Sequence, residues 1–163
     1  MVAQHVSQPC WHRSYRAPTC GTWLHVSSLG RVPGVPGAYT DLTRHPENTP
    51  VPGVLIVRID AQVYYANALT VRDRVKAMIA EMESPPRAVI FDMGAQEMID
   101  VTSRDIIKGL VKELHGNGIE VYAAEVHAPV LEIGNKTGLA ESIGQDHMFP
   151  TVDAAVRFIE ASA

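Results

Sequence analysis

In the last two thirds of the chain, short apolar runs rich in β-branched residues alternate with amphipathic stretches, and this alternation constrains the fold most. The apolar runs at 54–59, 88–93 and 119–125 are short and predict buried strands. Between them, apolar residues recur at helical spacing within 71–82 and 106–114, which predicts two helices. Strands that alternate with helices in this way predict an α/β domain with a mixed, largely parallel sheet.

Weaker signals predict the remaining elements. Residues 62–65 are expected to form a further short strand, and Asn67 is a suitable N-cap for the helix that follows. Pro129 suits the first turn of a helix that ends at Gly138, and Thr151 is expected to cap a final helix after a short strand. Right-handed crossovers place successive helices on the same side, so we expect the helices to pack mainly on one face of the sheet.

The first third of the chain differs in character from the rest. Residues 1–21 show neither a helical nor a strand period, and we expect a poorly ordered tail. Prolines and glycines punctuate residues 22–53, which predicts an extended connector with one short strand. The folded domain is expected to cover residues 54–163. The two cysteines, Cys10 and Cys20, both lie in the predicted tail, so the fold needs no disulfide.

Composition and motifs exclude several classes of function. The net charge is −4 and no Lys/Arg cluster stands out, which argues against a nucleic-acid partner. A transmembrane helix needs about 20 apolar residues, far more than any run here, so no transmembrane segment is expected. The spacing of Cys10, His12, Cys20 and His25 matches no zinc motif, and we expect no metal site. No set of catalytic motifs is present, so we expect no enzyme.

One strand-to-helix corner carries the candidate site. Thr102 begins the second helix, and its hydroxyl is suited to capping the helix N-terminus. Unpaired N–H groups at the same place would also stabilise a phosphate group. Asp92 and Asp100 end neighbouring segments and are expected to border the same rim, with Ser103 beside Thr102. A structural cap and a switch or ligand site therefore both remain open.

The succession of strand, Ile99–Ser103 corner, helix, Gly-x-Gly turn and strand resembles a STAS domain. Such domains occur in anti-sigma-factor antagonists and at the cytoplasmic C-terminus of sulfate permease (SulP) anion transporters. Two stretches resemble the transporter branch in particular, one in the connector and one at the start of the folded domain. They comprise His25-Val26, Leu29–Gly34, Tyr39, Leu42 and Arg44–Glu47, and then Pro52–Asp60 followed by Tyr64–Ala68.

The resemblance implies a STAS-like (SpoIIAA-like) fold and a non-enzymatic, cytoplasmic regulatory domain of a SulP-type sulfate or anion transporter, here without its membrane domain. Its implied partners are that membrane domain, another STAS domain, or a regulatory protein or kinase. Attachment to a transporter would place the domain at the cytoplasmic face of the inner membrane. In the antagonists the hydroxyl matching Thr102 is the phosphorylation site. One alternative is therefore a free-standing antagonist switched by phosphorylation at Thr102.

The other alternative is a sensor domain that binds GTP or ATP weakly at the rim of Asp92, Asp100, Thr102 and Ser103. No phosphate-binding loop supports a strong nucleotide site, and no other cofactor is expected.

Overall fold

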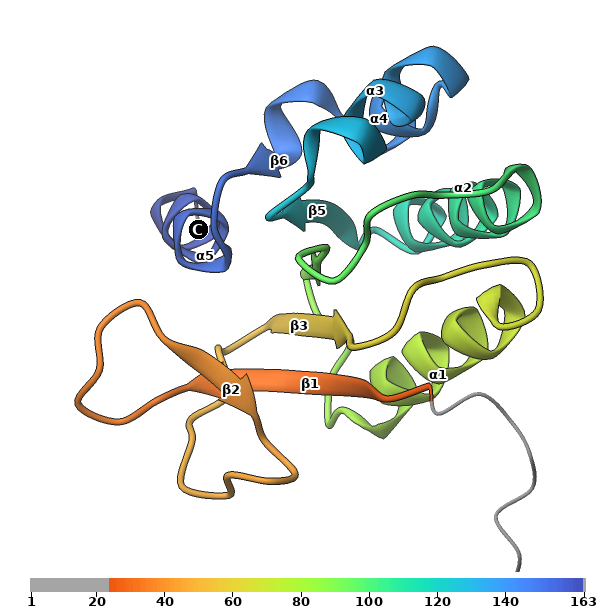
Figure 1. Cartoon of the computed structure of the whole chain (residues 1–163). Coiled ribbons are helices and arrows are strands. Elements are labelled where there is room, and N and C mark those ends of the chain that lie inside the picture. Colours follow the sequence, from red (N-terminus) through yellow and green to blue (C-terminus); the bar gives the residue numbers. More distant parts are fainter. Residues whose placement is uncertain (1–23, 163) are drawn as a thin grey trace, which may run out of the picture.

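Six strands form one mixed sheet, and helices lie on both of its faces (Figure 1). The computed structural model describes residues 24–162, so the predicted tail at 1–21 lies outside the described residues. The elements are β1 Val26–Arg31, β2 Tyr39–Asp41, β3 Val54–Ile59, α1 Ala68–Glu81, β4 Ala88–Asp92, α2 Val101–Gly116, β5 Glu120–Ala124, α3 Ala128–Thr137, α4 Leu139–Ile143, a 3₁₀ turn Gln145–His147, β6 Met148–Phe149 and α5 Val152–Ala161.

The order of strands across the sheet is β2-β1-β3-β4-β5-β6. Strands β3, β4, β5 and β6 run parallel, because each is reached through a crossover that contains a helix. Strand β1 runs antiparallel to β3, with Val26 opposite Ile59. The predicted α/β class and its mixed, largely parallel sheet are confirmed.

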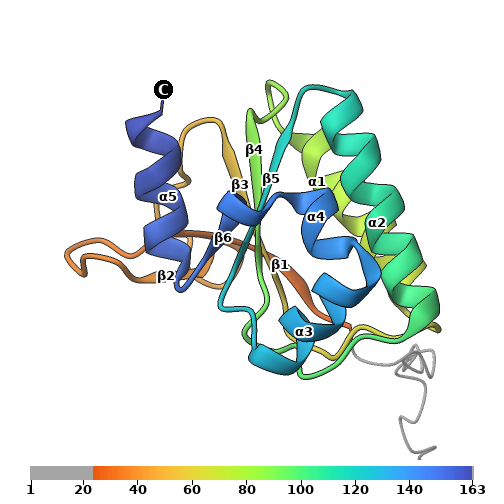
Figure 2. The same ribbon diagram turned by 90° about the horizontal axis from the view of Figure 1, so that it is seen from above.

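Two apolar clusters cover the two faces of the sheet, one on each face. The larger packs α1, α2 and α4 against one face, with Val57, Val89 and Val121 fully buried beneath them. The smaller packs α5 against the other face, over Ile56 and Ile90. Figure 2 shows α1 to α4 on one side of the sheet and α5 alone on the other. The helices therefore lie mainly on one face, as the sequence predicts.

Two local predictions are wrong. Residues 62–65 form a loop that leads into α1, because their backbone groups bond to side chains and turns rather than to a neighbouring strand. The connector contains two strands where one short strand was predicted, and β1 lies inside the sheet between β2 and β3. The sequence of β1 does not show the alternation of apolar and polar residues that is typical of a strand, because Ser27 and Ser28 are consecutive polar residues.

The helix ends agree with most of the predicted signals. Thr151 accepts a hydrogen bond from the N–H of Ala154 at the start of α5. Gly138 ends α3 at a φ of 72°, a left-handed conformation that glycine adopts without strain. Asn67 stands at the predicted N-cap position of α1, but its side chain accepts from the Tyr64 N–H instead of from the helix.

Candidate functional site

The carboxyl ends of the parallel strands bring three loops to one edge of the sheet. The β3–α1, β4–α2 and β5–α3 loops all begin there, and in open α/β sheets this edge is the usual place for binding sites. Because β1 is antiparallel to β3, its first residues also lie at this edge, where the N–H of Asp60 donates to the carbonyl of His25 at 3.0 Å. The preceding chain therefore enters the sheet beside these loops.

Asp100 caps α2 at this edge. One carboxylate oxygen accepts from the N–H groups of Thr102 at 2.9 Å and Ser103 at 3.0 Å. The other oxygen accepts from the Ser103 hydroxyl at 2.8 Å. The Ser103 N–H, then the Ser103 hydroxyl and the N–H groups of Thr102 and Tyr65, stabilise the carboxylate and lower the pKa of Asp100. The cap is thus a charged one that is complete at neutral pH.

The two predicted hydroxyl residues have different surroundings. Thr102 is the second residue of α2 and is exposed, and its predicted role as the N-cap is wrong because Asp100 holds that position. Ser103 is fully buried, and its hydroxyl is already committed to Asp100. Of the two hydroxyls, the accessible one is that of Thr102.

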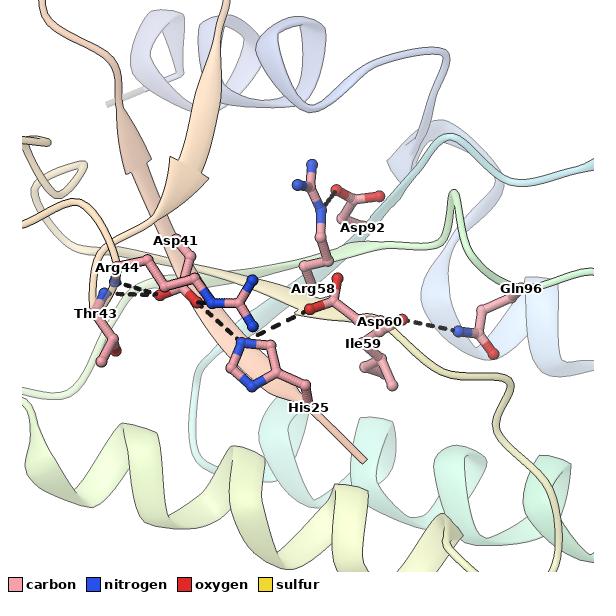
Figure 3. Close-up of polar contacts among 9 residues, drawn as sticks. All are labelled: His25, Asp41, Thr43, Arg44, Arg58, Ile59, Asp60, Asp92 and Gln96. Atoms are coloured by element: carbon pink, nitrogen blue, oxygen red, sulfur yellow. Dashed lines mark hydrogen bonds and ion pairs between the residues drawn. The ribbon is translucent and has the colours of Figure 1, made fainter. Parts of the chain in front are cut away.

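Asp92 is the last residue of β4, at the start of the loop that leads to this corner. Its neighbour Phe91 packs under the α1 and α2 side, so by alternation Asp92 points to the opposite face of the sheet. There its carboxylate accepts from Arg58 Nε at 2.7 Å (Figure 3). It also accepts from the N–H of Gly94 at 3.1 Å. The carboxylates of Asp92 and Asp100 have no hydrogen-bond partner in common. The expectation that they border one rim stays a prediction.

Gln96, which carries no recognisable signal in the sequence, joins two of the loops. Its side chain is buried; Oε1 accepts from the N–H of Val63 at 2.8 Å, and Nε2 donates to the carbonyls of Ile59 at 3.2 Å and Ala61 at 3.0 Å. Figure 3 shows Gln96 reaching across to the end of β3. The β4–α2 loop therefore holds the β3–α1 loop in place.

A second polar cluster fixes the point where the chain enters the sheet. His25 Nε2 lies 2.9 Å from an oxygen of Asp41 and 3.7 Å from one of Asp60, so the ring faces two carboxylates (Figure 3). Asp41 also accepts from the N–H of Thr43 at 2.7 Å. Partial burial alone would raise the pKa of Asp41, but the hydrogen bonds from His25, Thr43 and Arg44 outweigh it and leave the pKa lowered.

Exposed apolar side chains gather at the same edge. Tyr65 and Leu69 belong to the β3–α1 loop and the first turn of α1, and Met98 and Val101 belong to the corresponding part of β4–α2. The exposed fractions are 69% for Tyr65, 64% for Met98 and 66% for Val101. Large apolar residues left in water on adjoining loops are typical of a surface that binds a partner. We call these four residues the edge patch.

Metal-ligand clusters, long apolar helices and cavities of the described part of the chain bear on what it can bind. Between residues 24 and 162, no three His, Cys, Asp or Glu side chains are grouped closely enough to hold a metal ion. None of the helices described in this range is long and apolar enough to span a membrane. A cavity of about 60 Å³ beneath the edge is lined by apolar side chains such as Phe91, Ile107 and Val126, which do not suit a phosphate group.

Comparison with known proteins decides the family. Residues 45–155 match the STAS domain family. The chain belongs to the STAS domain family. Over 133 residues, or 82% of this chain, it is 31% identical to a probable sulfate transporter of Mycobacterium tuberculosis. It covers only 24% of that protein, and about a fifth to a quarter of the length of the other curated relatives of this kind.

Solved structures support the same fold. This STAS domain superposes on part of a murine anion transporter, Solute Carrier 26 family member A9, with a TM-score of 0.77 and 23% identity, covering 85% of this chain and 22% of the other. It superposes on a putative anti-sigma factor antagonist of Thermotoga maritima with a TM-score of 0.59 and 16% identity, covering 68% of this chain and 90% of the other. Both likenesses concern the fold.

Proposed function

We propose that this chain is the regulatory and interaction domain of a SulP-type sulfate or anion transporter, and that it acts on the cytoplasmic side by binding rather than by catalysis. The observation that carries the proposal is the edge patch, which lies where the preceding chain enters the sheet. Among the matched relatives, several are named as sulfate transporters, and each is several times longer than this chain. A membrane domain that precedes the STAS domain in such a protein would meet this edge first.

The charges beside the patch indicate the chemistry of the partner surface. Glu97 precedes Met98 directly, and Asp100 precedes Val101 directly, so acidic groups stand between the apolar side chains. An apolar partner surface bordered by Lys or Arg would complement this arrangement. The cytoplasmic segments of membrane proteins carry an excess of these residues.

A co-purification experiment tests this proposal. The 163-residue chain is produced together with the membrane part of the related transporter of Mycobacterium tuberculosis, and the complex is isolated in detergent. Replacing Met98 and Val101 with Asp should lower the recovered STAS domain by at least about tenfold, as expected when two contact residues are lost. Val35→Asp is the matched control, since Val35 is equally apolar and 53% exposed but lies in the β1–β2 turn. Equal losses in both variants would contradict the role of the patch.

A free-standing antagonist switched at Thr102 is the second candidate, and the exposed hydroxyl in the first turn of α2 favours it. In Thr102→Glu, the helix dipole would contribute about 0.3–1 kcal/mol, and repulsion from Asp100 and Asp105 would offset a similar amount. Stability should therefore barely change, while binding through the edge falls. Recovery of a protein kinase, without any membrane partner, in a pull-down with the parent chain would favour this candidate over the transporter domain.

Weak binding of GTP or ATP is the third candidate, and the corner gives it less support. Asp100 already accepts the N–H groups of Thr102 and Ser103, which a phosphate group would otherwise use. Its carboxylate would also repel the phosphate, so binding would need a divalent ion. Calorimetric titration with and without magnesium tests this candidate, and a submicromolar affinity without magnesium would contradict the reasoning.

A further inference from the structure

The exposed face of α2 carries a cationic hollow at the end far from the edge patch. Lys108, Lys112 and His115 follow one another at helical spacing, so their side chains share one side of α2. Together with Gly109 and with Ser142 of α4, they line a hollow of about 300 Å³. We call these five residues the α2–α4 hollow.

The two lysines of the hollow differ from the other lysines of the protein. Lys76 pairs with Glu113 and Lys136 pairs with Glu132, each at 2.6 Å. Among residues 24–162, no carboxylate lies within ion-pair distance of Lys108 or Lys112, although all four lysines belong to this range.

The acids close to these lysines are already engaged or out of reach. On α2 itself, Asp105 is bound by Arg104 at 2.7 Å, and Glu113 is bound by Lys76. On α4, Glu141 lies near Lys108 beside Gly138, but farther than an ion pair allows. Among residues 24–162, neither lysine of the hollow therefore has an ion-pair partner, and Glu141 is the unpaired acid near Lys108.

This arrangement is unfavourable for the helix itself. Like charges four residues apart, as in Lys108 and Lys112, destabilise a helix. Gly109 in the middle of α2 destabilises it again, and a Cβ added there would meet no atom within 4 Å, so close packing does not require glycine. Positions that break local rules without internal compensation are those expected to serve a function. A bound negative charge would compensate for the repulsion between Lys108 and Lys112, and the lack of a side chain at Gly109 leaves room for it.

We propose that the α2–α4 hollow binds a tetrahedral oxyanion, namely a phosphoryl or sulfuryl group. Lysine amines bind such groups as point charges, and the His115 ring contributes an N–H donor. The absence of a side chain at Gly109 leaves open space beside the two lysines. The same chemistry is offered by a free inorganic anion, a soluble phosphate ester or a lipid headgroup. This site is separate from Thr102 and does not depend on the proposed function.

Titration of the whole chain with inorganic phosphate and with sulfate, followed by amide NMR at constant ionic strength, tests the site. The expected result is a saturable shift of the amides of Lys108, Gly109 and Lys112. Each charge contact in water is worth about a fivefold change in affinity, so the double variant Lys108→Gln, Lys112→Gln should bind at least about tenfold more weakly. The double variant Lys76→Gln, Lys136→Gln removes the same charge from paired lysines and should bind like the parent.

Two further measurements sharpen the test. Gly109→Leu should fill the hollow and abolish the shifts, while its melting temperature shows that the chain is folded. Sedimentation with vesicles containing phosphatidic acid, compared with neutral vesicles, distinguishes a lipid headgroup from a soluble anion. Equal weakening in the two lysine double variants, or shifts confined to another part of the chain, would overturn the proposal. So would the absence of binding in both the ion and the vesicle experiments.

Discussion

Replacing Gln96 with alanine should destabilise the domain strongly, although the residue lies in a loop. The side chain is 2% exposed and makes three hydrogen bonds, to the Val63 N–H and to the carbonyls of Ile59 and Ala61. Each such bond contributes about 1 kcal/mol net, and alanine restores none of them, so the expected loss is about 3 kcal/mol. For a chain of this length that corresponds to a fall in melting temperature of about 6–12 °C.

Urea unfolding at neutral pH, with the slope of the transition held to that of the parent, measures this loss. Glu97→Ala is the control, because Glu97 is the exposed neighbour and a surface change should stay within about 0.5 kcal/mol. Gln96→Glu keeps the acceptor for Val63 but turns the donor toward the two carbonyls into an oxygen, so it should also destabilise the fold. Equal midpoints for Gln96→Ala and Glu97→Ala would refute the view that this side chain holds the two loops together.

Two other changes test the assignment of residues on α2. Asp100→Ala should lower the melting temperature more than Thr102→Ala, because the carboxylate and not the hydroxyl caps the helix. The pKa of Asp100 is lowered in the folded state, so its contribution to stability is complete above the unfolded value of about 3.9. That contribution is lost as the pH falls through the lower folded value. The melting temperatures of the parent and Asp100→Ala should therefore converge in acid. Leu110→Ala should cost about 2–5 kcal/mol and Lys112→Ala no more than about 0.5 kcal/mol in urea unfolding, and equal costs would show that the buried face of α2 is misassigned.

The regular part of the fold could be predicted because its signals are local. The runs at 54–59 and 88–93 are almost wholly apolar, as strands buried on both faces must be, and they form β3 and β4. β1 could not be predicted in the same way. Ser27 pairs opposite Arg58 and Ser28 opposite Val57, so the strand is held by hydrogen bonds to β3 that no local pattern reveals.

The position of the strand-to-helix corner can be predicted from the sequence, but the structural roles of its residues cannot. The strand-to-helix corner is recognisable because a hydroxyl and a carboxylate precede an amphipathic helix. The residue that caps α2 depends on where the helix begins. The helix begins two residues earlier than predicted, so Asp100 and not Thr102 is the N-cap. The partners of Asp92, which are Arg58 and Gly94, depend on strand pairing and on the loop after β4, and no local pattern reveals them. Gln96 and the edge patch depend on contacts between loops distant in the chain.

The antiparallel insertion of β1 gives the domain a directional mechanical response. The described chain begins at residue 24, His25 bonds to the end of β3 through the Asp60 N–H, and β1 then runs antiparallel to β3. Tension along the axis of β1 loads all of its hydrogen bonds to β3 at once, in shear. Tension across the sheet instead breaks these hydrogen bonds one after another, starting at His25. A force applied at His25 is thus resisted in the first direction, whereas in the second it separates β1 from β3 and leaves an unpaired edge of β3.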